Sequence, residues 1–474
     1  MDAVGIRVNS ASNVTIEGND IKNLVTRSDA LDATYLYGIS ASGAGSHTVT
    51  KNTVLKLINS TKPDANYATV VIGISISATG AQTVSGNTIY NIGNTNTTAS
   101  SGTQKLYYVY GMVRSGTGAG TIVNGNKIYN LYSSSNGAGS KADIILGLFS
   151  QSNAKWTYTN NMISLRGGSF SADRFIVGIT DYNTSSNNSY YYNSVAITGN
   201  AAGTNPTIAF WRNSTANIVL RNNIFYNSRS GGNWLHYAID NTPTTNSGTG
   251  WSSNYNLFVG TNASVIGWWG NDSLKSFSEW KTISQGDTNS YSNTAANIPV
   301  TDLFIDHLNG DLRINTNNSL CWYANRKGIP IAGITTDIDN NTRNASTANG
   351  PTDIGAFEFK TNSAPISYVQ SGTLAPENST SYRFGGNTNL TIAWDAASVQ
   401  TPSNLDVKYY TRRQVTHTKP RIYGYWNIVP NGGNNYIYNI TFKYDESQLG
   451  NINENNLVPC KSDNNGNSWT AFTT

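Results

Sequence analysis

The sequence predicts an all-β protein, a right-handed parallel β-helix of about eight coils followed by a small β-sandwich. The first observation is a repeated heptad, GNTIYNI at 86–92 and GNKIYNL at 125–131. The second is the composition, with 12% charged and 11% aromatic residues, which is the opposite of the signature of disorder. The third is a period-two alternation of apolar residues, which excludes the helical repeats of similar length.

Each repeat contains two anchors in a fixed order. The first is a short apolar segment around glycine, as in Tyr37-Gly38-Ile39 and Val177-Gly178-Ile179. The second is an alternating strand that ends in asparagine, and successive asparagines are 33, 35, 39, 35, 32, 30 and 33 residues apart. These asparagines are Asn19, Asn52, Asn87, Asn126, Asn161, Asn193 and Asn223, with Asn256 extending the series. A drifting period that keeps both anchors indicates one coil per repeat with loops of variable length.

The residue types of the repeat suit a stacked coil. A propeller blade would need four comparable strands per period, whereas two strong strands and one weak one are visible. In a coil, the aliphatic residues of the second anchor face inward and stack on their equivalents one coil away. The Gly-Asn pairs mark turns with a left-handed backbone, which both residues tolerate. The asparagine side chains then form a hydrogen-bonded ladder along the rod, so the repeat is structural.

The chain divides into three predicted regions. Residues 1–260 hold the repeats, 261–360 form a closing module, and 361–474 form a sandwich in which alternation returns after a linker. The strongest short helix is LKSFSEWKTI at 274–283, with Ser273 or Ser276 as its N-cap. A helix at this place would cover the exposed edge of the last coil, as solenoids require for solubility.

Two segments of the closing module carry a resemblance to a known family. TTDIDNNTRN at 335–344 and DIGAFEF at 353–359 resemble the closing module of secreted bacterial β-helix surface proteins of the pectate-lyase-like fold. These proteins carry a choice-of-anchor type of C-terminal region, and the type IX route often exports them. Asn340 departs from the glycine that is usual after Asp-Ile-Asp. The resemblance implies a surface protein, an adhesin or a glycan-active enzyme.

The C-terminal region resembles the immunoglobulin-like modules that follow such β-helices. The match lies in GYWNI at 424–428 and NITFKYDESQLGNINENNL at 439–457. Similar modules continue for one or two further strands and a sorting tail. The start of the chain has no basic and apolar leader pattern, so we expect a signal segment upstream and further sequence at both ends.

Charge and cysteine content exclude several function classes. The net charge of +4 is spread without a basic cluster, so nucleic acid is not an expected partner. No apolar run reaches about 18 residues, so no transmembrane helix is predicted. The two cysteines, Cys321 and Cys460, exclude a multi-cysteine zinc cluster and are expected to be unpaired.

The repeats are poor in catalytic residue types. No glutamate lies between Glu17 and Glu279, and the middle coils hold only Asp143, Asp173 and Asp181, so a glycosidase with paired carboxylates is disfavoured. The best lyase-like group is Asp181, Arg212 and His236, expected on the outer face of neighbouring coils. The structural alternative, which we favour, is an ordinary ion pair between Asp181 and Arg212.

Two further groups have a functional and a structural interpretation. Asp337, Asp339 and Asp353 could bind Ca²⁺ or could cap turns and pair with Arg343, and the second interpretation is favoured. Four tryptophans could form a sugar-stacking platform or pack under the capping helix, and the second is again favoured. These are Trp251, Trp268, Trp269 and Trp280.

The sequence therefore favours a non-catalytic extracellular component of a surface, matrix or filament, built on a β-helix rod. The alternatives are a polysaccharide lyase or related glycan-active enzyme, and a glycan-binding adhesin without turnover. The expected partners are other copies of the chain, stacked head to tail, or surface glycans. No cofactor is expected other than the alternative of Ca²⁺.

Overall fold

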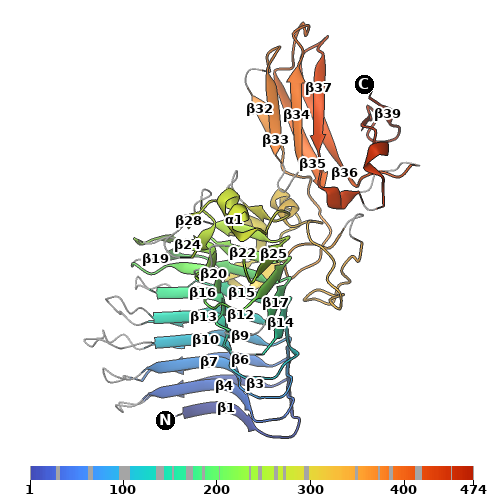
Figure 1. The fold of residues 1–474 in the computed structure, drawn as a ribbon. Helices are drawn as coiled ribbons and strands as arrows, with labels where there is room; N and C mark the ends of the chain where they lie inside the picture. The colour runs from blue at the N-terminus through green and yellow to red at the C-terminus, as the bar shows by residue number, and fades with distance from the viewer. Residues whose placement is uncertain are drawn as a thin grey trace.

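The structure is a computed structural model of the chain (Figure 1). It describes residues 2–27, 33–61, 68–95, 107–134, 143–151, 154–166, 174–183, 187–201, 203–233, 236–243, 248–260, 265–270, 274–292, 298–346, 351–371, 374–383, 388–411, 419–449 and 451–472.

The chain is all-β, with 50% strand and 6% helix, and most of it is a parallel β-solenoid of about 7 turns. Three parallel sheets run along the rod, and each coil contributes one strand to each sheet (Figure 1). This confirms the fold class that the repeats predict. Small antiparallel sheets follow at the C-terminus.

Sheet 1 contains β1 (Asp2–Asn9), β4 (Thr34–Ser42), β7 (Thr69–Ile76), β10 (Tyr107–Arg114), β13 (Asp143–Ser150), β16 (Arg174–Asp181), β20 (Thr207–Arg212), β24 (His236–Asn241), β27 (Gly267–Trp269) and the antiparallel β28 (Leu274–Lys275). Sheet 2 contains β2 (Thr15–Glu17), β5 (Thr48–Thr50), β8 (Thr83–Ser85), β11 (Thr121–Asn124), β14 (Trp156–Thr159), β17 (Asn188–Tyr191), β21 (Ile218–Arg221) and β25 (Trp251–Asn254). Sheet 3 contains β3 (Asp20–Thr26), β6 (Thr53–Asn59), β9 (Thr88–Asn94), β12 (Lys127–Ser133), β15 (Met162–Leu165), β18 (Ser194–Ile197), β22 (Ile224–Asn227), β26 (Leu257–Gly260) and β29 (Tyr291–Ser292). The short strands β19 (Asn200–Ala201) and β23 (Ser230–Gly231) pair beside the solenoid.

The glycine anchor of sheet 1 changes which face of the sheet a side chain occupies. In β16, Ile176 and Ile179 both belong to the interior core, whereas Val177 belongs to a cluster on the outer face. Strict alternation would place residues 177 and 179 on the same face, so the alternation shifts by one residue at Gly178. A Cβ atom on Gly178 would lie 2.2 Å from Val195 Cγ1, which explains why glycine stands at this close approach.

The asparagine at the end of each sheet 2 strand forms a continuous buried ladder. Asn126 Nδ2 donates to Asn161 Oδ1 at 2.9 Å and to the Val84 carbonyl of the preceding coil at 3.0 Å. Its Oδ1 accepts hydrogen bonds from the backbone and side-chain nitrogens of Asn87. The same pattern links every coil from Asn19 to Asn256. These hydrogen bonds replace those that each amide group made to water before it was buried.

The residue before each ladder asparagine has a positive φ. Five of these eight residues are the expected glycine or asparagine, but Lys51, Tyr192 and Tyr255 also adopt this conformation. The full set is Gly18, Lys51, Gly86, Gly125, Asn160, Tyr192, Asn222 and Tyr255. The ladder hydrogen bonds hold the turn strongly enough for side chains that disfavour this backbone.

The last coil is covered by helix α1 (Phe277–Ser284). Ser276 is its N-cap and forms a capping box with Glu279, while the alternative cap, Ser273, lies outside the described residues. Trp280 is fully buried against Trp251 and Trp269. The ladder also ends here, because Asn256 donates from its backbone nitrogen to Ser290 and from Nδ2 to Ser253, and not to a further asparagine.

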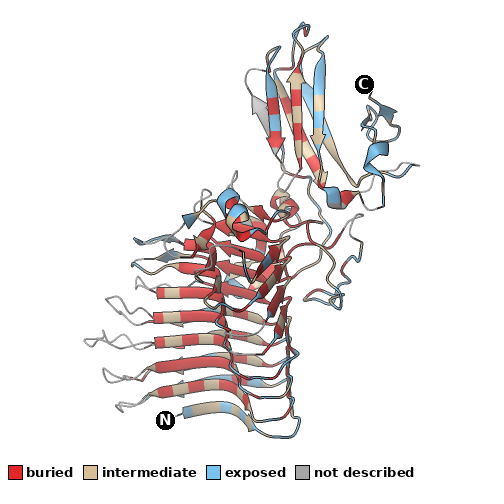
Figure 2. Cartoon of the chain, viewed as in Figure 1, coloured by how far each residue is buried: buried red, intermediate tan, exposed pale blue. Residues whose placement is uncertain are grey.

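The rest of the closing module runs back along the outside of the solenoid (Figure 1). It contains α2 (Val300–Leu303), β30 (Phe304–Asp306), β31 (Asp311–Ile314) and a 3₁₀ turn at Ser319–Tyr323. Its apolar residues pack on the outward residues of sheet 3, including Met162, Tyr226 and Leu257. The burial of the later coils on this side therefore depends on a segment distant in sequence (Figure 2).

The C-terminal region contains two small antiparallel sheets around one core. One has the order β32 (Tyr368–Ser371), β35 (Asn404–Thr411), β36 (Gly424–Asn431), and the other β33 (Ser379–Arg383), β34 (Asn389–Trp394), β37 (Tyr438–Lys443). Leu390, Trp394 and Val407 are buried between them. A short pair follows, β38 (Cys460–Lys461) with β39 (Thr470–Ala471). Cys321 is buried, Cys460 is exposed, and both are free thiols.

Candidate functional site

The three candidate catalytic residues lie inside the solenoid. Asp181 and Arg212 are completely buried and His236 is 8% exposed. The outer-face position expected for them is wrong, because the shift at the anchor of each strand turns Asp181 and Arg212 inward. His236 precedes the anchor of β24 and is buried against Thr207 and Gly231. Asp181 pairs in register with Arg212, and Arg212 with Asn241, whereas His236 lies at the other end of β24, about 17 Å along the strand. Asp173, an acid of the same region, lies outside the described residues.

The Asp181 carboxylate is bound by the chain itself. Oδ2 accepts hydrogen bonds from Tyr190 Oη at 2.7 Å and Asn188 Nδ2 at 2.8 Å, and Oδ1 accepts one from Asn183 N at 3.1 Å. Burial raises the pKa of Asp181, while these donors and the charge of Arg212 oppose the rise. A carboxylate with its lone pairs occupied in this way has a structural role and is closed to a substrate.

Arg212 and His236 are similarly engaged. Arg212 donates from Nε to the Ala216 carbonyl and from Nη1 to Asn241 Oδ1, both at 3.0 Å. Burial lowers the pKa of Arg212 to about 10. His236 Nε2 lies 3.1 Å from the Gly231 carbonyl and must carry the proton, so Nδ1 accepts from Thr207 Oγ1 at 2.9 Å. Burial lowers the pKa of His236, which keeps the ring neutral.

Two of the three candidate Ca²⁺ ligands, Asp337 and Asp353, are engaged as turn caps. The Asp337 carboxylate accepts hydrogen bonds from the backbone nitrogens of Asp339, Asn341 and Glu358 at 2.7–2.9 Å. Asp353 accepts from Arg326 N and Phe359 N. Within the described part of the chain, no group of three or more His, Cys, Asp or Glu residues is placed to hold a metal ion. Asp337 and Asp353 therefore cap turns, whereas Asp339 contacts Arg313 at 3.4 Å and the ion pair of Arg343 in the described residues is with Glu358.

Arg343 fixes the closing module to the solenoid. Its guanidinium donates to Glu358 at 3.1 Å and to Asn160 Oδ1 at 2.8 Å, and lies 3.9 Å from the centre of the Tyr192 ring. Asn222 exchanges hydrogen bonds with the backbone of Ile329. Three left-handed turn residues, Asn160, Tyr192 and Asn222, therefore also serve as docking points, a role that the repeat pattern does not indicate.

The four tryptophans divide between two environments. Trp251, Trp269 and Trp280 pack under the capping helix, whereas Trp268 stands on the outer face of sheet 1. There it is in register with Asp240, which is in register with Trp211. The repeat pattern does not place these residues together, since they come from three coils and alternation alone misplaces their faces.

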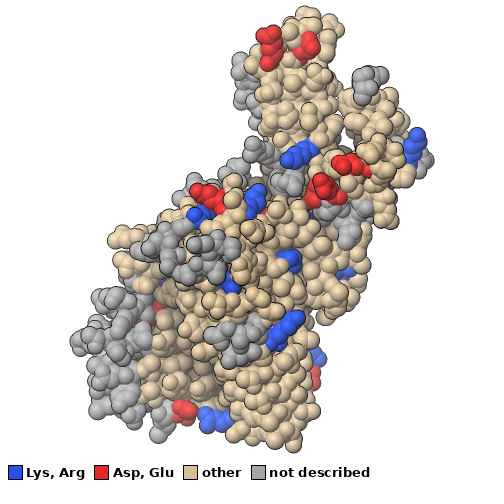
Figure 3. Space-filling view, in the orientation of Figure 1, with Lys and Arg blue, Asp and Glu red and all other residues tan. Residues whose placement is uncertain are grey.

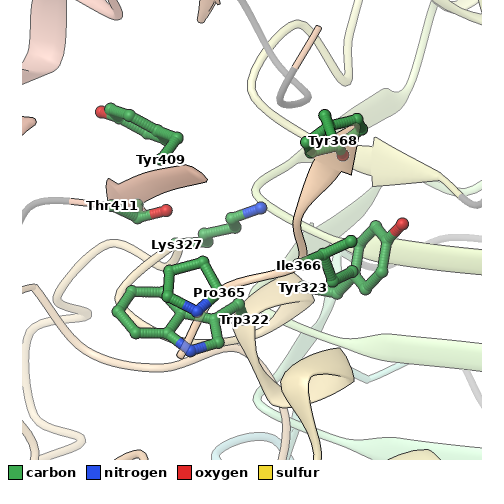
Figure 4. Close-up of a pocket in the computed structure, with 8 residues that line it drawn as sticks. All are labelled: Trp322, Tyr323, Lys327, Pro365, Ile366, Tyr368, Tyr409 and Thr411. Carbon is green, nitrogen blue, oxygen red and sulfur yellow. The ribbon is translucent and has the colours of Figure 1, made fainter. Parts of the chain in front are cut away.

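The closing module and the sandwich meet at a small aromatic contact. The Trp322 and Tyr410 rings lie 5.5 Å apart at 82°. A cavity of about 30 Å³ lies beside them, lined by Tyr323, Lys327, Ile366, Tyr368 and Tyr409 among others (Figure 4). Lys327 Nζ lies 4.0 Å from the Tyr291 ring centre. The volume suits a single water molecule rather than a ligand.

Comparison with protein-family models, with curated proteins and with solved structures finds no match to this chain. None of the helices in the described ranges has the length and apolar composition of a membrane-spanning segment. The class of the protein therefore follows from its own structure, which is a parallel β-solenoid with antiparallel sheets at its C-terminus.

Proposed function

We propose that the protein is a non-catalytic extracellular rod, a component of a cell surface or matrix that spaces or presents what it carries. The observation that carries the proposal is the position of Asp181, Arg212 and His236. The ionisable residues on which a lyase mechanism would depend are buried and hydrogen-bonded to the chain. They complete the interior of the coil.

The surface supports the same proposal. Figure 3 shows a face of the molecule on which charged side chains are few and scattered. Glycan cleavage needs a concentrated group of acids or bases on the outer face of neighbouring coils. The hydroxyl- and amide-rich surface suits a rod that remains soluble without such a group.

The ends of the solenoid bear on how copies would assemble. Head-to-tail stacking needs an open strand edge at each end. In the described residues, α1 covers the last coil and the antiparallel strand β28 ends sheet 1. We therefore favour a rod that presents its sides over a filament built by stacking coil on coil.

The test is a turnover screen with a shape measurement. The purified full chain is incubated with acidic and neutral polysaccharides, and new reducing and unsaturated ends are measured. We expect no turnover and dispersed rods in negative-stain electron micrographs across a concentration series. Turnover that survives repurification would overturn the non-catalytic proposal, and filaments that lengthen with concentration would overturn the assembly argument.

A further inference from the structure

The outer face of sheet 1 carries a carboxylate between two tryptophans. Trp211, Asp240 and Trp268 occupy equivalent positions on β20, β24 and β27, and we call them the Trp-Asp-Trp slot. Ile239 belongs to the interior core and Asn241 bonds the buried Arg212, so the Asp240 side chain between them points outward. The two indoles belong to the outer-face cluster and are partly exposed.

The spacing of the slot follows from the strands. Neighbouring strands are about 4.8 Å apart, so positions on β20 and β27 are separated by about 10 Å. Aspartate is short and tryptophan is long, so Asp240 lies lower on the outer face than the two indoles, and the Nε1 edge of Trp211 reaches Thr242, two residues beyond Asp240. A group seated above Asp240 would lie about 5 Å from each of the two strands that carry the indoles, and a cation–π contact reaches about 6 Å from a ring centre.

In the part of the chain that the structure describes, the Asp240 carboxylate has no cationic partner. Its Oδ1 accepts a hydrogen bond from Thr242 Oγ1 at 2.9 Å, and Thr242 in turn accepts one from Trp211 Nε1 at 2.6 Å. Among the described residues, Asp240 forms no ion pair. It is 7% exposed, and burial raises its pKa to about 7. A buried carboxylate with one donor is costly to ionise unless a positive charge is supplied.

We propose that the Trp-Asp-Trp slot binds a quaternary ammonium group, such as that of choline. Both parts of the slot attract the same chemistry, because indole faces and a carboxylate each favour a positive charge. A methylated ammonium is weakly hydrated and loses little on entering an apolar slot. This inference goes beyond the role of the rod and holds whether or not the rod is catalytic.

The test measures binding to the full chain by isothermal titration calorimetry. The probes are tetramethylammonium, choline and phosphocholine, with 3,3-dimethylbutan-1-ol as the neutral isostere of choline. We expect choline to bind at least tenfold more tightly than the isostere. Phosphocholine separates free choline from a phosphorylated headgroup as the source, and binding of either supports the slot.

Variants assign the binding to the slot. We expect Asp240→Asn and Trp268→Leu each to weaken choline binding at least tenfold, and Trp268→Phe to retain part of it. Asp20→Asn, an exposed aspartate of β3 paired with Lys22, is the matched control and should leave binding unchanged. Circular dichroism establishes that each variant is folded.

Three results would overturn the proposal. Equal affinity for choline and its isostere would show an apolar cleft without recognition of charge. Unchanged binding in Asp240→Asn would place the ligand elsewhere. Binding of neutral saccharides alone would assign the tryptophans to sugar stacking.

Discussion

Asp181 and Asp240 are buried carboxylates on opposite faces of sheet 1, and their surroundings differ. Asp181 faces the interior and accepts hydrogen bonds from Asn183, Asn188 and Tyr190. Asp240 faces outward and, among the described residues, accepts a hydrogen bond from Thr242 alone. Burial raises the pKa of both. The first carboxylate is satisfied by the fold, whereas the second is left to be satisfied by something else.

The largest effect is expected at the interior carboxylate. Asp181→Ala would leave Tyr190 and Asn188 without their acceptor and Arg212 without its nearest opposite charge. We expect a loss of about 3–5 kcal/mol in the free energy of unfolding. Chemical denaturation measures it, with the exposed Asp20→Asn as control. A loss below about 1 kcal/mol would contradict the interior network.

Removing the charge of the outer carboxylate, Asp240, should stabilise the protein, whereas removing Asp181 should destabilise it. The folded-state pKa of Asp240 is about 7 against an ordinary value of 3.8, so the folded chain holds this proton more tightly. The wild-type protein therefore loses stability as the pH rises from about 4 to 7.

Asp240→Asn lacks this titration and should be more stable than wild type at pH 8, by at most about 4 kcal/mol. The difference should shrink towards pH 4. Thermal melting at both pH values measures it. If Asp240→Asn changed the melting temperature by the same amount at pH 8 and at pH 4, Asp240 would be ionised in the folded protein at little cost.

The asparagine ladder allows a second comparison, between a central coil and the first described coil. Asn126 makes its hydrogen bonds in a buried central coil, whereas Asn19 lies on the first described coil and is partly exposed. We expect Asn126→Ala to cost about 3 kcal/mol and Asn19→Ala less than about 1 kcal/mol. Urea denaturation of the two variants compares them directly. Equal costs would show that burial along the ladder is not what sets its strength.

The smallest effect concerns the cap of the last coil. Ser276→Ala removes the side-chain acceptor of the α1 capping box and should cost about 1 kcal/mol. Ser278→Ala, an exposed position on the same helix, should change stability by only a few tenths. Differential scanning calorimetry separates the two variants. A larger effect at Ser278 would contradict the assigned cap.

Local sequence patterns were sufficient to predict the solenoid itself. The recurring asparagine predicts the coil and its ladder, because one residue type repeated once per coil lies beside its own copies when the strands stack. Alternating apolar residues predict the core strands, and Ser276 with Glu279 predicts the start of the capping helix.

The tertiary structure decided which face each functional residue occupies. Gly178 and its equivalents shift the alternation by one residue, at a place where the backbone closely approaches Val195 of the same coil and the Ala209 carbonyl of the next coil. It turns Asp181 inward and leaves Asp240 outward between Trp211 and Trp268. A single sequence specifies the strands locally, but the face of a side chain depends on how the backbone packs against the next coil.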